Sequence, residues 1–245
     1  MRTLTHVILF DIDGTLVSSQ KSELDESRRY VDAIREVTGK DTLVSPSRFA
    51  GMVDPQICRI ILAEAGINEP ELDNYLPKVL SRMAIAYKKM PKEVVLNRGV
   101  QDLLELLSHS TRHVLGVLTG NISIIAKEKL AAARIGQYFK EGFYADNYED
   151  RNHLVEDAVR SCVSKYSLTN AKNVIIVGDT PLDVKAARAS HATSIGIASG
   201  VYSMETLSLS GATMTFPNLT PTNDLLSFLS FQESYRGQLA NSVRE

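Results

Sequence analysis

Residues 6–16 read HVILFDIDGTL, a short apolar run that ends in two aspartates and a glycine. The run His6–Phe10 predicts a buried β-strand, because it is continuously apolar and the Asp13-Gly14 pair that follows is typical of a turn. Comparable runs recur later, and a weaker one lies at 142–145. The clear ones are His113–Leu118, Asn173–Val177 and Thr193–Ile197.

Helix-like segments lie between these runs. Apolar residues recur at helical spacing in 100–107, in 124–130 and in 153–166. Buried strands that alternate with amphipathic helices predict an α/β fold with a Rossmann-like, doubly wound parallel sheet covered on both faces. In such sheets ligands bind at the carboxyl ends of the strands.

Residues 18–91 break this alternation, because they hold three helix patterns and no convincing strand. The patterns lie near 25–38, after Asp54 as an N-cap with Pro55 in the first turn, and across 72–87. We expect 18–91 to be an inserted helical cap domain and 1–17 with 92–245 to form the core. The alternative is that these helices flank the same sheet. The polar end, 231–245, is expected to be a loose helix or a frayed tail.

Composition limits the classes of function. The chain has 245 residues and a formal net charge of -2, which implies no general attraction to nucleic acid or to an anionic membrane. Cys58 and Cys162 are the two cysteines, and their separation supports neither a disulfide framework nor a thiolate metal site. No apolar run approaches the roughly 20 residues of a membrane helix. We therefore expect a soluble, cytoplasmic protein; the sequence does not indicate its oligomeric state.

Asp11 and Asp13 directly follow the first predicted strand. Both side chains can face one site if the chain turns at Gly14. Buried carboxylates this close repel each other, so the pair requires a cation or a shared proton. One of them can then attack as a nucleophile while the other transfers protons. The same pattern is also ordinary turn chemistry after a strand.

Two further segments stand where predicted strands end. Thr119-Gly120-Asn121 precedes a helix, so its hydroxyl and free N–H groups suit a phosphate, although a plain helix cap reads the same way. Asp179 and Asp183 offer oxygen ligands of the kind that magnesium prefers, although an aspartate at a helix start is also a common cap.

Arg151 stands between these segments and opens a predicted helix. Considered without the other segments, Arg151 is expected to be a solvated charge on the surface.

In this order the segments make the sequence resemble the haloacid dehalogenase superfamily, from Thr5 to about Leu229. The likeness is strongest to the phosphoglycolate-phosphatase-like branch, through 51–55 and 198–200. The resemblance implies that Asp11 attacks phosphorus and becomes an aspartyl-phosphate. It also implies that Asp13 protonates the leaving oxygen and later activates water, with Thr15 orienting Asp13.

The resemblance implies a ligand set as well. Mg²⁺ would be bound by the Asp11 carboxylate, the Asp13 backbone carbonyl and Asp179, with Asp183 supporting them. Phosphoryl oxygens would be held at 119–121, by Thr119 and the Asn121 backbone with Gly120 between them.

One position departs from the family pattern. Many relatives carry a lysine, usually followed by proline, at the third motif, and no Lys-Pro occurs between Asn121 and Gly178. Arg151 is the expected substitute, because a guanidinium can pair with Asp11 and grip phosphate through two parallel hydrogen bonds. Lys140 and Lys165 are less well placed.

The expected activity is magnesium-dependent hydrolysis of a small phosphorylated metabolite of undetermined identity. A dehalogenase has no need of a second acid, so Asp13 disfavours that chemistry. A phosphonate-cleaving relative would need a cap lysine, for which Lys21 is available. A phosphomutase uses the same residues and differs mainly in excluding water. A non-catalytic binding module is the remaining alternative, although no motif acid is lost. Cap residues 51–54 are candidates for substrate contact.

Overall fold

The computed structural model describes residues 6–18, 23–90 and 93–231. Six parallel strands form one sheet in the order β3-β2-β1-β4-β5-β6. The α/β class with a parallel sheet is thereby confirmed. The strands are β1 (His6–Phe10), β2 (His113–Leu118), β3 (Glu141–Phe143), β4 (Val174–Gly178), β5 (Thr193–Ile197) and β6 (Met214–Phe216).

Strand β1 lies between β2 and β4, at the point where the strand order reverses. Its last residue, Phe10, pairs in register with Val117 of β2 and Val177 of β4. The chain therefore leaves all three strands at one edge of the sheet. A reversal of this kind opens a crevice at the carboxyl edge, where α/β proteins bind their ligands.

Helices cover both faces of the sheet. They are α4 (Val100–Ser108), α5 (Ser123–Ala132), α6 (Arg151–Lys165), α7 (Pro181–Ala189), α8 (Met204–Leu209) and α9 (Asn223–Phe231), with short 3₁₀ turns η2 (Gly136–Tyr138) and η3 (Ala171–Asn173). Alternate β1 residues point to opposite faces, so Ile8 packs with residues of α4, α5 and α9, whereas Leu9 packs with residues of α6 and α7. Each fully buried aliphatic side chain contributes about 1.5–3 kcal/mol.

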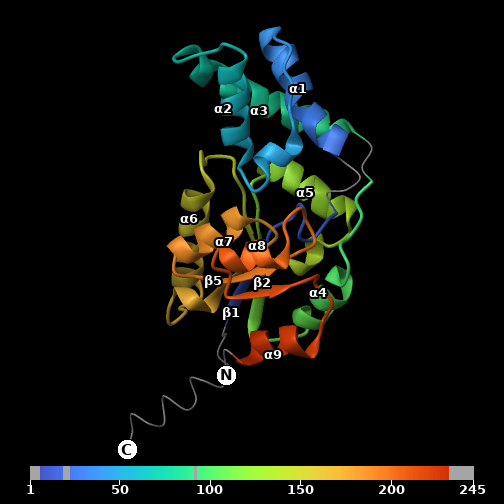
Figure 1. Cartoon of the computed structure of the whole chain (residues 1–245), viewed down its shortest axis with the longest axis vertical. Helices are drawn as coiled ribbons and strands as arrows, with labels where there is room; N and C mark the ends of the chain where they lie inside the picture. Colours follow the sequence, from blue (N-terminus) through green and yellow to red (C-terminus); the bar gives the residue numbers. More distant parts are fainter. Residues whose placement is uncertain (1–5, 19–22, 91–92, 232–245) are drawn as a thin grey trace, which may run out of the picture.

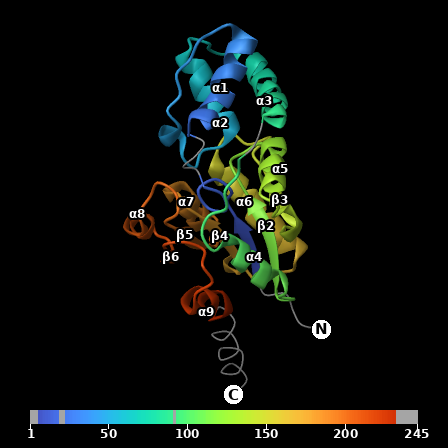
Figure 2. The same cartoon turned by 90° about the vertical axis from the view of Figure 1, so that its right-hand side faces the viewer.

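A separate group of helices, here called the helical layer, comprises residues 23–89: α1 (Glu23–Thr38), η1 (Pro46–Phe49), α2 (Asp54–Glu64) and α3 (Glu71–Lys89). Its own apolar core includes Ile34, Ile61 and Met83, and Ile122 and Ile125 of the α5 region join it. Figures 1 and 2 show the layer beyond the end of the sheet, above α5, rather than against either face of the sheet. Within the described residues, no helix is both long enough and apolar enough to cross a membrane.

Two local expectations differ from the structure. Asp54 does not cap α2, because Val53 is the N-cap residue and Asp54 is the first helical residue, with its buried carboxylate bonded elsewhere. Strand β4 begins at Val174, since Asn173 ends the η3 turn. Lys21 and residues 232–245 lie outside the described part of the chain.

Candidate active site

Asp11 continues β1 into the crevice. Its backbone N–H donates to the Val177 carbonyl oxygen at 2.9 Å, and the residue is buried. The chain then turns at Gly14, which has φ +80°, and a Cβ there would overlap the Asp179 carboxylate. Asn97 holds the turn by donating from Nδ2 to the carbonyl oxygen of Gly14 at 2.7 Å. Glycine is therefore required here both by the backbone conformation and by the approach of Asp179.

Asp11, Asp179 and Asp183 form a buried carboxylate cluster in which one oxygen of each lies within 4.8 Å of the others. The Thr15 hydroxyl donates to Asp179 Oδ1 at 3.2 Å, so Thr15 orients a carboxylate of this cluster. A role of Thr15 in orienting Asp13 stays a prediction.

Arg151 is the first residue of α6 and is buried, with 4% of its side chain exposed. Asp150 caps this helix by accepting from the N–H groups of the two residues after Arg151 at 2.5 and 3.2 Å. The guanidinium lies 3.1 Å from Asp11 Oδ1 and also bonds Asp183. It therefore joins two members of the carboxylate cluster and is not a surface charge. By contrast, 57% of the Lys165 side chain is exposed, and it pairs with Glu141.

Asp183 serves the fold as well as the cluster. Its Oδ2 accepts from the Thr180 backbone N–H at 3.1 Å and from the Thr180 hydroxyl at 2.7 Å, which completes a capping box at the start of α7. Asp183 therefore caps its own helix and also belongs to the carboxylate cluster. Both oxygens of Asp183 already accept hydrogen bonds from Arg151 and Thr180. Asp183 is therefore better placed to hold the residues around a bound ion than to ligate the ion directly.

Burial and mutual repulsion act on the cluster. The pKa of Asp11 is raised from 3.8 to about 7 by burial, with Asp183 and Asp13 adding to the increase and Arg151 opposing it. The pKa of Asp179 is also raised, first by burial and then by the carboxylates of Asp11 and Asp183. Three carboxylates face one guanidinium, so a hard divalent cation fits the charge and the oxygen donors of this cluster.

Thr119, Gly120 and Asn121 follow β2 at the same edge of the sheet. The Asn121 N–H donates to Thr119 Oγ1 at 3.3 Å, and both side chains are buried. A Cβ at Gly120 would overlap the Met52 carbonyl oxygen, and the Gly120 carbonyl accepts from the Asp54 N–H at 2.7 Å. Gly120 therefore allows the backbone of the helical layer to approach the loop after β2 closely.

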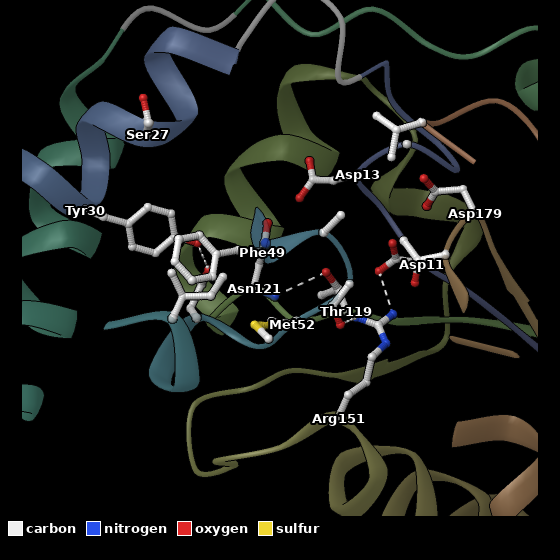
Figure 3. Close-up of a pocket in the computed structure, with 18 of the residues that line it drawn as sticks. Asp11, Asp13, Ser27, Tyr30, Phe49, Met52, Thr119, Asn121, Arg151 and Asp179 are labelled. Atoms are coloured by element: carbon white, nitrogen blue, oxygen red, sulfur yellow. Dashed lines mark hydrogen bonds and ion pairs between the residues drawn. The ribbon is translucent and has the colours of Figure 1, made fainter. Parts of the chain in front are cut away.

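A pocket between the helical layer and the sheet edge brings these segments together, as Figure 3 shows. Its floor holds the acids, Arg151 and residues 119–121, and its opposite wall includes Tyr30, Phe49 and Met52. Every site residue expected from the sequence lines this pocket except Thr15 and Asp183, which lie directly behind Asp179 and Arg151.

Two buried groups at this site were not expected from the sequence. Lys129 of α5 donates from Nζ to both carboxylate oxygens of Asp13, at 2.6 and 2.7 Å. It occupies the buried face of its helix beside Ile125, Ala126 and Leu130. A lysine at a position where helical periodicity demands an apolar residue is the signal that would have found it.

The second group is centred on Asp54, which belongs to the residues 51–54 expected to contact substrate but whose hydrogen bonds the sequence did not predict. Its carboxylate accepts from Arg29 Nη2 at 3.0 Å, from the Tyr30 hydroxyl at 2.6 Å and from the Ile122 N–H at 2.9 Å. The last of these bonds crosses from the helical layer to the start of α5. Arg151 makes a second crossing, because its Nη1 donates to the Gly51 carbonyl oxygen at 3.1 Å.

Known proteins are similar to this chain in sequence and in fold. Residues 8–197 match the family described as haloacid dehalogenase-like hydrolase, and the chain belongs to that family. It is 26% identical over 200 residues to a phosphoglycolate phosphatase of Pseudomonas fluorescens (strain Pf0-1), covering 80% of this chain and 71% of the relative. These findings place it in the phosphoglycolate-phosphatase-like branch, as an enzyme of the phosphatase type.

Solved structures agree on the fold. A hydrolase from Pseudomonas syringae matches with a TM-score of 0.70 and 23% identity, over 93% of this chain and 98% of that one. A β-phosphoglucomutase from Clostridium difficile matches with a TM-score of 0.65 and 16% identity, over 97% of this chain and all of that one. The fold is therefore common to proteins named as a hydrolase and as a β-phosphoglucomutase, and it does not by itself indicate which activity this chain has.

Proposed function

We propose that this chain is a magnesium-dependent phosphatase that hydrolyses a small phosphorylated metabolite of the phosphoglycolate type through a phosphorylated Asp11. The observation that carries the proposal is the contact of Arg151 with Asp11, 3.1 Å apart, inside a pocket that also receives Asp13. A buried carboxylate aligned by a guanidinium is a nucleophile beside a phosphate-binding cation.

In the first step an Asp11 oxygen bonds to phosphorus while the bond from phosphorus to the leaving oxygen breaks. Asp13 gives its proton to that oxygen, so the product leaves as an alcohol. Arg151 and the residues 119–121 hold the phosphoryl oxygens, where negative charge spreads in the transition state.

In the second step a water oxygen bonds to phosphorus and its proton passes to Asp13. The bond between phosphorus and Asp11 breaks, which restores the Asp11 carboxylate and releases inorganic phosphate. Mg²⁺, when bound, neutralises charge on the phosphoryl group throughout. Asp11, the Asp13 carbonyl and Asp179 would hold it, with Asp183 behind them.

The helical layer supports a second part of the proposal, that 18–91 is a cap domain on a core of 1–17 and 92–245. The layer reaches the site through the Gly51 carbonyl and the Met52 backbone. It also supplies the pocket wall opposite Asp11, so we infer that Tyr30, Phe49 and Met52 select the organic part of the substrate.

A phosphomutase is the second candidate, favoured by the same contact between Arg151 and the Gly51 carbonyl. A helical layer that closes directly on the catalytic guanidinium excludes water, and exclusion of water is what a mutase needs. Release of inorganic phosphate at the rate of substrate loss would argue for the phosphatase. Isomerisation without release would argue for the mutase.

The test is hydrolysis of 4-nitrophenyl phosphate, with and without Mg²⁺, by the wild type, by Asp11→Asn and by Asp102→Asn. Asp102 is an exposed carboxylate on α4 and serves as the matched control. We expect magnesium-dependent phosphate release that Asp11→Asn loses by at least about 10³-fold, since the nucleophile is gone. Undiminished release by Asp11→Asn would refute the mechanism.

A further inference from the structure

Lys129 is a charged side chain in an apolar setting. Only 2% of the side chain is exposed, and it projects from the buried face of α5. Removing an ammonium group from water is strongly unfavourable unless a partner compensates for the lost hydration. The compensation is specific, because Nζ donates to both oxygens of one carboxylate, that of Asp13.

The position of that carboxylate matters for the proposed reaction. Figure 3 shows it turned away from the carboxylates of Asp11 and Asp179, toward the helical layer. In phosphoryl transfer the attacking and leaving oxygens lie roughly in line on opposite sides of phosphorus. With Asp11 attacking from the floor of the pocket, the leaving oxygen faces the helical layer, which is the side where Asp13 is held.

Lys129 also touches the helical layer itself. Its Nζ lies 5.9 Å from the centre of the Tyr87 ring, near the end of α3. One side chain thus links a core helix, the helical layer and the carboxylate that transfers protons.

We propose that Lys129 is a positioning residue that fixes the Asp13 carboxylate on the leaving-group side of the pocket. The inference rests on the proposed phosphatase function. Lys129 acts through Asp13, whose two carboxylate oxygens it bonds. It keeps this carboxylate within reach of the leaving oxygen and of the water used in the second step. Because Nζ bonds the ionised carboxylate, the proton that Asp13 gives to the leaving oxygen is one that it first takes from the bound phosphate monoester, and the water later supplies another.

The dependence on the leaving group tests this role. Phenolate is a poor leaving group that needs a proton as the bond to phosphorus breaks, whereas 2,4-dinitrophenolate leaves without one. For both substrates kcat/KM reports only the steps up to departure of the leaving group. A general loss of structure would lower both values equally, but a misplaced Asp13 lowers only the value for phenyl phosphate.

The variants are Lys129→Met, which keeps length but removes the charge, and Lys129→Arg, which keeps the charge. Lys127→Met is the matched control, because Lys127 is exposed on the same helix. In Lys129→Met we expect kcat/KM for phenyl phosphate to fall roughly 10- to 100-fold, a share of the 10²- to 10⁴-fold that a positioned acid contributes. The value for 2,4-dinitrophenyl phosphate should stay within about threefold, and Lys129→Arg should restore part of the loss.

Equal losses on the two substrates, or no loss on either, would overturn the proposal. Should Lys129→Met fail to fold, Lys129→Gln supplies a shorter, neutral donor for the same comparison. Crystal structures of wild type and variant give a readout that needs no activity, in which the Asp13 carboxylate should leave its position only in the variant. If the wild type hydrolyses neither ester, the proposed function fails. The role of Lys129 is judged separately by the crystal structures, because an Asp13 carboxylate that keeps its position in the variant would show that Lys129 does not position it.

Discussion

Arg151 brings one positive charge to two buried carboxylates and one carbonyl oxygen. The guanidinium is planar and offers five N–H donors, which is why a single side chain can serve Asp11, Asp183 and the Gly51 carbonyl together. An ammonium group is a point charge on a flexible stem and cannot keep this geometry. The charge of Arg151 and its shape therefore contribute separately.

From this we predict that Arg151→Lys keeps the fold but lowers kcat/KM by about 10²-fold, or about 2.7 kcal/mol of transition-state stabilisation. The measurement is steady-state hydrolysis of an aryl phosphate. Arg160→Lys, with its exposed side chain on the same helix, should change kcat/KM by less than twofold. Equal activity of Arg151→Lys and wild type would show that charge alone suffices.

At the same scale, the sequence identifies site residues that belong to a short local motif. It misses residues whose role depends on a partner far away in the sequence. Asp11, Asp13 and Asp179 follow apolar runs, so their shared edge could be predicted. Lys129 and Asp13 are 116 residues apart, and no local pattern joins them. The sequence around Arg151 is typical of a surface charge, because its burial depends on Asp11, which follows β1, and on Asp183 of α7.

At the scale of elements, helix α2 is joined to helix α5 through Asp54. This carboxylate neutralises buried Arg29 and accepts the Ile122 N–H at the start of α5. It is the first residue of its own helix, so a negative charge there is also favourable to the helix dipole. The contact therefore stabilises the docking of the helical layer as well as its interior.

We predict that Asp54→Asn lowers the free energy of unfolding by about 3 kcal/mol, because it removes the buried carboxylate that pairs with the buried Arg29 guanidinium. Urea denaturation followed by circular dichroism gives this value. Asp73→Asn removes an exposed partner of Arg59 and should leave the free energy of unfolding nearly unchanged. A similar small loss for both variants would mean that Arg29 is compensated by other groups.

The strands could be predicted where their burial requires a run of apolar residues in the sequence. Strands β1, β2 and β5 are rich in apolar residues and almost wholly buried because both faces of the sheet are covered, and their bounds match the expected ranges. Strand β6 is a three-residue edge strand with Met214 39% exposed, so it lacks that pattern. The prediction that Asp54 caps α2 was wrong for a different reason. Its carboxylate accepts hydrogen bonds from Arg29, Tyr30 and Ile122 instead of from the N–H groups of its own helix.

At the scale of the whole molecule, the carboxylate cluster couples stability to pH and to metal. Burial, together with the carboxylates of Asp183 and Asp13, raises the pKa of Asp11 to about 7, although Arg151 opposes the shift. A carboxyl group whose pKa is raised by folding stabilises the metal-free protein most below its unfolded pKa. That contribution is lost as pH rises through the folded pKa, because ionisation is then favoured in the unfolded chain.

A divalent cation at the cluster is expected to reverse this trend, since it would bind the ionised carboxylates of the folded state only. We therefore predict that the increase in Tm on adding Mg²⁺ is small near about pH 5 and grows toward about pH 8. Differential scanning fluorimetry with and without Mg²⁺ across this range measures it. Because the readout is stability, it does not depend on knowing the substrate.

Asp179→Asn provides the contrast for this measurement. Removing one carboxylate should abolish the increase from Mg²⁺, and it should also make the metal-free protein more stable than wild type at about pH 8, since one buried repulsion is gone. Asp102→Asn should follow the wild type in both respects, because its carboxylate is exposed and distant from the cluster. An increase in Tm that is independent of pH, or that survives in Asp179→Asn, would place the cation elsewhere on the molecule.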